Sequence, residues 1–319
     1  MGARSSERAR IEMLSRIFGT DGSGRTILGI GDDAAVIAQG RDPLVWTIDA
    51  QVENIHFRRD LVSMADLGYR ATMAATSDLA AMGASPLGLL AGLVLPEDVT
   101  DEDLRAIAEG QREAAKEVGT QIIGGNLARG REISITTTAL GETPRPLGRS
   151  GAKLGEVVAI AGPLGLSAAG LALIGTKHEN EADAAPAVRA YRRPVARIAA
   201  GLAARDVASA AIDVSDGLSR DVGHVAHASG VLVVLDLPAI VTPELERAAA
   251  LLQADAYQLA LQGGEDYAVV VTLPEDHIPA GFKRIGRVLP PQDGKIGVAV
   301  ERTDGSYELL DERGYDHFR

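Results

Sequence analysis

The amino-acid sequence predicts an α/β protein built from two domains. At 319 residues, the chain is longer than one hydrophobic core usually organises. Segments with strand-like and helix-like patterns alternate in both halves, which is typical of α/β architectures. Over residues 143–151 the chain becomes rich in Pro, Gly and Arg. We therefore expect one domain over residues 1–147 and a second, α/β domain over residues 148–319.

The composition is that of a folded, acidic protein. Hydrophobic residues make up 46% of the chain, and the formal net charge is −12 with a pI near 5.0. Such a charge disfavours nucleic acids and anionic membranes as partners. The absence of cysteine excludes disulfides, thiolate metal sites and cysteine nucleophiles, and it fits a reducing compartment. The longest apolar stretches contain too many Gly, Ser and Asp to span a bilayer, so we expect a cytoplasmic protein.

In the N-terminal half, local patterns predict alternating helices and strands. Thr100, followed by Asp103, resembles the capping box that begins a helix, and Gly119 would end this helix. A short N-terminal helix that packs on the body is predicted by apolar residues at helical spacing: Ile11, Leu14, Ile17 and Phe18. The other elements predicted in this half are a helix over 64–82 and strands over 44–49, 87–95, 121–123 and 132–140.

The second half continues the same alternation. Ser215, Asp216 and Gly217 are expected to open a helix that Gly230 ends. The apolar face of this helix would consist of Leu218, Val222, Val225 and Ala226. The other elements predicted in this half are helices over 164–174 and 187–204 and strands over 156–161, 210–214, 231–235, 267–272 and 284–288.

The stretch from Gly29 to Phe57 gathers acidic residues beside glycines. It begins GIGDDAAV, continues with an apolar run that delivers Asp49, and closes on ENIHF. Asp32, Asp33 and Asp49 would repel one another if they came together, and burying them without partners is costly. A divalent cation removes both problems, and hard oxygen ligands suit Mg²⁺. An acidic turn that faces water is the alternative interpretation.

Acidic residues recur in one context, at a strand end or a helix boundary beside small residues. The members of this set are Asp32, Asp33, Asp49, Asp78, Asp213, Asp216, Glu265 and Asp266. Each alone is typical of a cap or a turn, but together they suit convergence on metal-bound phosphates. Arg149, in the basic linker, is a candidate clamp for a transferred phosphate. A dinucleotide-binding fingerprint at Gly29–Ala34 is rejected, because its two carboxylates would face a pyrophosphate.

Eight motifs follow one another along nearly the whole chain: GIGDDAAV, TIDAQVENIHF, TSDLAAMGASP, IIGGN, RSGAKLG, IDVSDGL, GGEDY and GYDHF. In this order they resemble the thiamine-monophosphate kinase family, in the superfamily that includes aminoimidazole ribonucleotide synthetase. The resemblance implies a two-domain, synthetase-like α/β (α+β) fold. Its N-terminal mixed-sheet domain would dimerise, and its C-terminal domain would be α/β. The resemblance also implies ATP as co-substrate and Mg²⁺ as cofactor, with the γ-phosphoryl group passed directly to thiamine monophosphate to give thiamine diphosphate.

The resemblance also implies site residues, motif by motif. The implied metal ligands are Asp33, Thr47, Asp49, Asp78, Asn126, Asp213 and Asp216. The implied ATP contacts are Gly125, Asn126, Arg149 and Ser215, and the implied substrate contacts are His56, Glu265 and Tyr315. No general base is expected, because the acceptor is a phosphate monoester that is largely ionised at neutral pH. Phosphoryl transfer then relies on positioning and charge neutralisation.

The sequence departs from the family pattern at three positions. Asn126 stands where the family's Gly-Gly-Asp motif has a carboxylate, so a neutral carbonyl oxygen replaces a charged ligand. Glu312 is the nearest counterpart of an aromatic residue near the final motif, and Ile48 stands where the family often has Thr. These departures bear on metal number and affinity.

Two alternatives remain. One is another ATP-dependent synthetase of the superfamily. The lack of Cys disfavours activities like those of selenophosphate synthetase and the hydrogenase-maturation homologue, and aminoimidazole ribonucleotide synthetase lacks the GGEDY and GYDHF combination. The other is a non-catalytic protein that binds nucleotide or thiamine phosphate, which the replacement at Asn126 suggests.

Overall fold

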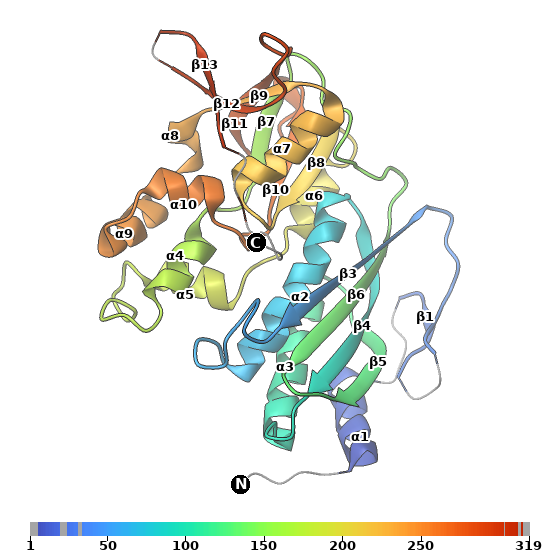
Figure 1. Ribbon diagram of the computed structural model, residues 1–319. Coiled ribbons are helices and arrows are strands. Elements are labelled where there is room, and N and C mark those ends of the chain that lie inside the picture. The colour runs from blue at the N-terminus through green and yellow to red at the C-terminus, as the bar shows by residue number, and fades with distance from the viewer. Residues whose placement is uncertain (1–5, 20–23, 31–33, 303, 312–313, 315–319) are drawn as a thin grey trace. The chain divides into compact units, whose positions relative to one another are not determined.

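A computed structural model describes residues 6–19, 24–30, 34–302, 304–311 and 314 (Figure 1). The chain forms two compact units. The N-terminal unit comprises Met1–Leu79 and Ser85–Pro144, and the C-terminal unit comprises Ala80–Ala84 and Arg145–Arg319. Each unit has its own mixed sheet and its own helices, which confirms the predicted α/β class.

The N-terminal unit is built on a four-stranded mixed sheet. Its elements are α1 (Glu7–Phe18), β1 (Thr26–Leu28), β2 (Val36–Ile37), β3 (Leu44–Val52), α2 (Met64–Ala81), β4 (Ser85–Leu95), α3 (Asp101–Glu117), β5 (Ile122–Arg129) and β6 (Ser134–Glu142). The sheet has the order β3-β6-β4-β5, in which only β4 and β5 are parallel. α2 and α3 cover one face of it (Figure 1). Residues at alternate strand positions, such as Leu89, Ile135 and Ala139, are fully buried and form the core.

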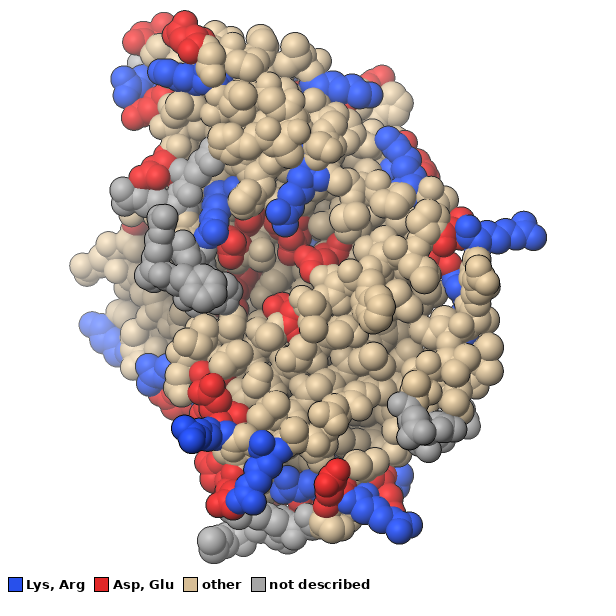
Figure 2. Space-filling model, turned by 45° about the vertical axis from the view of Figure 1, so that its right-hand side comes forward, with Lys and Arg blue, Asp and Glu red and all other residues tan. Residues whose placement is uncertain are grey.

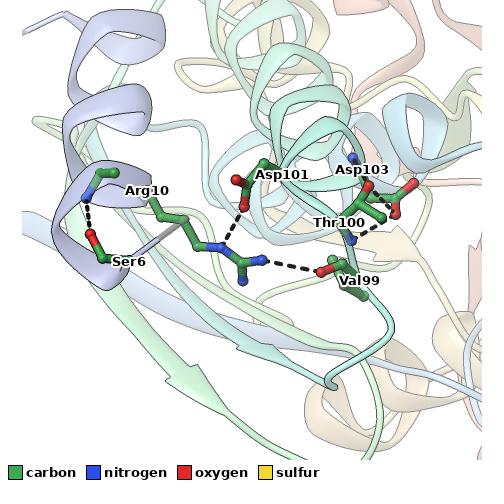
Figure 3. Close-up of polar contacts among 7 residues, drawn as sticks. Ser6, Arg10, Val99, Thr100, Asp101 and Asp103 are labelled. Atoms are coloured by element: carbon green, nitrogen blue, oxygen red, sulfur yellow. Dashed lines mark hydrogen bonds and ion pairs between the residues drawn. The ribbon is translucent and has the colours of Figure 1, made fainter. Parts of the chain in front are cut away.

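The helix at the N-terminus is fastened to the start of α3 (Figure 3). Arg10 Nε donates to the carboxylate of Asp101 at 2.7 Å, and Arg10 Nη2 donates to the carbonyl oxygen of Val99 at 3.2 Å. α3 begins with the predicted capping box: Thr100 Oγ1 accepts from the Asp103 backbone N–H at 3.1 Å, and Asp103 accepts from the Thr100 backbone N–H at 2.9 Å. Both predicted helices are therefore confirmed.

The C-terminal unit is built on a seven-stranded sheet in the order β13-β12-β9-β11-β7-β10-β8. Its strands are β7 (Val157–Ala161), β8 (Ala210–Val214), β9 (Leu232–Leu235), β10 (Ala268–Leu273), β11 (Lys283–Leu289), β12 (Gly297–Glu301) and β13 (Tyr307–Leu309). Its helices are α4 (Leu166–Leu173), α5 (Ala185–Arg192), α6 (Ile198–Ala204), α7 (Leu218–Ser229), α8 (Leu237–Ile240), α9 (Pro243–Leu252) and α10 (Ala256–Gln262), with the 3₁₀ turn η1 (Glu275–His277). Neighbouring strands are antiparallel except β9 and β12. Strands β7, β10 and β8, at one end of this order, are buried along their whole length, so this part of the sheet is covered on both faces.

Two predicted elements differ in extent from those of the structure, and no element was predicted where the structure has β1, β2, α8, α9, α10, β12 and β13. The single helix expected over 187–204 is two helices, α5 and α6. Pro194 lies between them and disfavours helical backbone at the preceding residue. The strand expected over 121–123 continues through Gly125 and Asn126 to Arg129, because β5 pairs with β4 along this length. The two glycines therefore lie inside a strand instead of ending one.

Among the described helices, none combines the length and the hydropathy that a membrane span requires. On the face that Figure 2 shows, Lys and Arg side chains are interspersed with Asp and Glu, and no broad basic patch gathers there.

Candidate functional site

In the N-terminal unit, Thr47, Asp49 and Asp78 lie on the same side of the sheet, as two observations show. Successive side chains of a strand alternate between its faces, so Thr47 and Asp49 lie on the face of β3 that also carries the buried Gln51. Asp78 reaches this face from α2, where Thr47 Oγ1 donates to Asp78 Oδ2 at 2.5 Å. Asp49 Oδ1 accepts the backbone N–H of Ala50 at 2.7 Å. The fold thus joins three predicted metal ligands on one side of one sheet.

The donor set has the chemistry of a Mg²⁺ site. Thr47, Asp49 and Asp78 offer hard oxygen atoms, and protein Mg²⁺ sites commonly use one or two carboxylates with substrate phosphates and water. Asp32 and Asp33 lie outside the described residues. Within the described ranges, no three His, Asp or Glu side chains are close enough to hold a metal ion by themselves. These residues fit Mg²⁺ as part of a ligand set. A phosphate would fill the remaining coordination positions of the ion.

Gly125 and Asn126 lie in β5, opposite Ala91 and Gly92 of β4. A Cβ at Gly125 would lie 2.0 Å from the carbonyl oxygen of Ala91, so this position requires glycine. Beside these residues is a cavity of about 860 Å³ lined by side chains of α1, β3, β4, β5 and β6. The apolar face of α1, which was expected to pack on the body of the protein, lines this cavity with Ile11, Leu14 and Phe18.

His56 follows β3 in a tight turn in which Asn54 has φ +64°. The backbone N–H of Val52 donates to His56 Nδ1 at 3.1 Å, and the His56 N–H donates to the Val52 carbonyl oxygen at 2.9 Å. A ring nitrogen that accepts a hydrogen bond carries no proton, so the proton of the neutral ring is on Nε2. His56 is therefore oriented by its own backbone turn as an Nε2–H donor.

In the C-terminal unit, Asp213 lies in β8 and is 6% exposed. Ser215, Asp216 and Gly217, which we call the SDG loop, connect β8 to α7, and Ser215 and Asp216 are half-buried. The Asp216 carboxylate lies 3.6 Å from the guanidinium group of Arg220. The predicted helix begins directly after the loop, as expected. Three of the predicted metal and nucleotide residues thus lie within four positions of the chain.

The GGEDY segment is attached to the SDG loop through the backbone. The N–H of Glu265 donates to the Ser215 carbonyl oxygen and the N–H of Tyr267 donates to that of Val214, both at 2.8 Å. Glu265 and Tyr267 have φ of +62° and +48°, a region that non-glycine residues rarely occupy. A Cβ at Gly264 would lie 2.6 Å from the Ser215 carbonyl oxygen. The fold therefore brings the predicted substrate residue Glu265 next to Ser215.

Asp266 connects the GGEDY segment to the start of α4. Its carboxylate oxygens accept the backbone N–H groups of Gly165 at 2.5 Å and Ser167 at 3.1 Å, at the start of α4. Burial raises the pKa of Asp266 to about 7, although these two hydrogen bonds act in the opposite direction. Gly165 has φ +71° and lies so close to Leu259 that a Cβ would come within 2.6 Å of its carbonyl carbon.

Of the two remaining predicted contacts, Arg149 lies near Ser229, at the end of α7 that is distant from the SDG loop. The Arg149 side chain is exposed, and its backbone carbonyl oxygen accepts from Ser229 Oγ at 3.4 Å. Tyr315 lies outside the described residues. Its neighbour Gly314 approaches the SDG loop so closely that a Cβ would lie 2.6 Å from the Asp216 carbonyl oxygen. The start of the C-terminal tail is thus adjacent to the loop.

Sequence reasoning missed Asp221, whose side chain contacts all three residues of the SDG loop. Its Oδ2 accepts the backbone N–H groups of Ser215, Asp216 and Gly217 at 3.0, 3.0 and 3.1 Å. Burial raises the pKa of Asp221 to about 6 against the effect of these bonds. The only sequence signal is an acidic residue in the first helical turn, which is common at helix starts and does not distinguish a buried residue from an exposed one.

Most of the chain is similar to known proteins. Models of AIR synthase related protein match it over residues 31–143 (N-terminal domain) and 153–303 (C-terminal domain). The thiamine-monophosphate kinase of Mycobacterium tuberculosis (strain CDC 1551 / Oshkosh) is 38% identical over 86% of this chain and 82% of its own length. That of Salmonella typhimurium (strain LT2) is 38% identical over 91% of both chains.

A solved structure described as "AaThiL complexed with AMPPCP and TMP" superposes with a TM-score of 0.81 at 31% identity, covering 98% of this chain and 97% of that chain. The sequence and the fold agree over both halves of the molecule. The chain belongs to the thiamine-monophosphate kinase family of AIR synthase related proteins.

Proposed function

We propose that this chain transfers the γ-phosphoryl group of ATP directly to thiamine monophosphate and forms thiamine diphosphate. The observation that carries the proposal is its similarity, over 98% of the chain, to AaThiL complexed with AMPPCP and TMP. The thiamine-monophosphate kinases of M. tuberculosis and S. typhimurium, each 38% identical, support the same activity.

In the N-terminal unit, Thr47, Asp49 and Asp78 are the proposed metal-binding residues, together with Asp33. The hydrogen bond from Thr47 to Asp78 fixes the orientation of one carboxylate. Gly125 and Asn126 would meet ATP along β5, where the absence of a side chain at Gly125 lets a ligand approach the backbone. Asn126 would add an amide oxygen as a further metal ligand.

In the C-terminal unit, Asp213 and Asp216 are the proposed metal-binding residues, and Ser215 and Arg149 would meet ATP. Glu265, held beside Ser215 by a backbone hydrogen bond of 2.8 Å, is the proposed contact to thiamine monophosphate. A carboxylate suits this substrate because its thiazolium ring is cationic. From the N-terminal unit, His56 Nε2–H would donate to the substrate phosphate. Tyr315, near the C-terminus, would also lie near the substrate.

The reaction joins two polyanions in an acidic protein, and when bound, Mg²⁺ supplies the charge neutralisation that this requires. The chain's own task is to orient the two phosphates and exclude water. No general base is needed, since the second pKa of a phosphate monoester is about 6. The acceptor oxygen therefore carries its charge before it reaches the site.

We propose a homodimer that forms through the N-terminal unit. Leu44, Trp46 and Ile48 lie on the outward face of β3 and are 60%, 72% and 65% exposed. An exposed apolar strip on a sheet face commonly marks an association surface. A molar mass near twice the 33.3 kDa of the chain, measured by light scattering, is the expected result. We also propose that the protein is cytoplasmic. The boundary between its two domains is proposed to lie between residues 147 and 148.

The test is formation of thiamine diphosphate by the purified protein. Product should form from ATP and thiamine monophosphate with Mg²⁺, but not with unphosphorylated thiamine and not after chelation of the metal. Asp49→Ala should abolish turnover while the protein stays folded, because the substitution removes a ligand and also relieves carboxylate repulsion. Asp60→Ala is the control, since Asp60 is exposed and pairs with Arg58. No product with abundant Mg²⁺ would refute the proposed activity.

A non-catalytic binding protein is the second candidate, and the neutral Asn126 favours it. In that case, calorimetry would detect binding of nucleotide or thiamine monophosphate without turnover, and Asn126→Asp would create activity.

A further inference from the structure

Asp221 occupies an unusual position in the C-terminal unit. It lies in the first turn of α7, and its side chain folds back onto the loop that precedes the helix. A single carboxylate oxygen, Oδ2, accepts three consecutive backbone N–H groups, those of Ser215, Asp216 and Gly217, at 3.0–3.1 Å. Asp221 is only 3% exposed, so water does not compete strongly for these hydrogen bonds.

These N–H groups lie where ligands often bind. Backbone N–H groups at the start of a helix have no partner within the helix, and they commonly receive a side-chain cap or a bound phosphate. The N-cap residue of α7 is Gly217, which provides no side-chain cap. Asp221 takes the place of an external anion. The SDG loop therefore cannot offer these three N–H groups to a phosphate while Asp221 accepts them.

The carbonyl side of the loop is also fixed, but by other residues. The Ser215 carbonyl oxygen accepts the N–H of Glu265 at 2.8 Å. Gly314 lies against the Asp216 carbonyl oxygen, where a Cβ would come within 2.6 Å. Removing the Asp221 carboxylate would release the N–H side of the loop and leave these carbonyl contacts in place. The contribution of Asp221 can thus be separated from that of the GGEDY segment.

We infer that Asp221 is a positioning residue, which fixes the SDG loop so that Ser215 and Asp216 present oxygen ligands to metal-bound nucleotide. This inference rests on the proposed function, in which Ser215 and Asp216 meet MgATP. Residues that orient a ligand group commonly change metal affinity by about 10–100-fold when they are replaced. Asp221 touches neither ligand in this account and acts only through the loop.

The test uses three variants of the full-length protein. Asp221→Ala removes the acceptor. Asp221→Asn keeps the shape and one carbonyl oxygen, which can still accept these N–H groups, so it is the conservative variant. Val222→Ala is the matched control, because Val222 is the next residue of α7, is 1% exposed, and makes no hydrogen bond to the loop through its side chain. Val222→Ala reports the effect of destabilising the same helix.

Two measurements decide the role. The first is hydrogen–deuterium exchange of the peptide covering residues 213–222 without ligand, which reads the loop N–H groups directly. Exchange should accelerate in Asp221→Ala, less in Asp221→Asn, and not in Val222→Ala beyond its overall loss of stability. The second is calorimetric binding of a non-hydrolysable ATP analogue over a Mg²⁺ series. The Mg²⁺ concentration for half-maximal binding should rise about tenfold or more in Asp221→Ala, by less in Asp221→Asn, and by less than about twofold in Val222→Ala.

The inference is overturned if Asp221→Ala matches Val222→Ala in both measurements, because Asp221 is then only part of the folded core. It is also overturned if wild-type protein binds no MgATP analogue, and the proposed function falls with it. If the wild type binds the analogue but forms no thiamine diphosphate, only the proposed function fails. The binding series then still decides the role of Asp221.

Discussion

The hydroxyl of Thr47 donates a hydrogen bond of 2.5 Å to the carboxylate of Asp78, and this bond joins β3 to α2. It fixes one carboxylate oxygen at the face of the sheet where Asp49 also lies. Thr47→Val keeps the shape of the side chain but removes the donor. We expect the half-saturating Mg²⁺ concentration to rise about tenfold, as for other residues that orient a metal ligand. The loss of stability should stay near the net value of one hydrogen bond, about 1 kcal/mol.

Thr72→Val is the matched control for this substitution. Thr72 is buried in α2, and its hydroxyl donates to the Gly68 carbonyl oxygen within the same helix at 3.1 Å. Its replacement should leave the Mg²⁺ dependence unchanged. Equal Mg²⁺ dependence in Thr47→Val and Thr72→Val would show that the Thr47–Asp78 bond serves only the fold.

His56→Ala should weaken the binding of thiamine monophosphate selectively. The Val52 N–H holds Nδ1 as an acceptor, so Nε2–H is the donor of the ring and the proposed contact to the substrate phosphate. A hydrogen bond to a charged group contributes about 1.5–3 kcal/mol, which corresponds to a rise in KM of about 10–100-fold. The KM for ATP should change less than about twofold. His277→Ala is the control, because His277 is exposed and its Nδ1 lies 2.9 Å from the Asp276 carboxylate. An equal effect on both substrates in His56→Ala would contradict the assignment.

Gly125→Ala should destabilise the N-terminal unit and impair nucleotide binding. Its Cβ would lie 2.0 Å from the backbone oxygen of Ala91, which cannot move without disturbing the β4–β5 pairing. Overpacking of this kind costs about 1–3 kcal/mol, visible as a lower Tm. Gly124→Ala is the neighbouring control, because its Cβ would meet only the end of the Leu90 side chain at 2.9 Å. Comparable Tm values for the two variants would mean that β5 tolerates the clash.

Asp266→Asn should reduce the pH dependence of stability. Burial raises the pKa of Asp266 from its ordinary value of 3.8 to about 7, so the folded state binds this proton more tightly than the unfolded state does. The contribution of Asp266 to stability is then fully present below pH 4 and is lost as pH rises towards and through 7. The variant cannot titrate, so its Tm should fall less than that of the wild type between pH 4.5 and 8.

The absolute Tm of Asp266→Asn should be lower at acidic pH, since the amide replaces one of two acceptors for the Gly165 and Ser167 N–H groups. Asp255→Asn is the control, because Asp255 caps α10 through one N–H bond at an exposed position. A Tm difference between wild type and Asp266→Asn that stays constant with pH would argue that Asp266 is ionised throughout this range.

Much of the fold was predictable because its signals are local. The Thr100–Asp103 capping box, the apolar spacing of α2, and the helix start after Gly217 are each set by residues within a few positions of one another. Pro194 carried a local signal too, and the break between α5 and α6 follows from it. The path of β5 through Gly125 had no local signal, because pairing with β4 outweighs the turn preference of two glycines.

By itself, the sequence determined the two-unit α/β architecture, the family, and the residue types of the proposed site, because periodicity, caps and motif order are properties of neighbouring residues. Only the tertiary structure decided that Thr47 meets Asp78 and that Glu265 lies beside Ser215. It also decided that Asp221 and Asp266 are buried acceptors of backbone N–H groups. Whether a carboxylate faces water or replaces a missing hydrogen-bond partner depends on segments distant in the chain, and no local pattern encodes that contact.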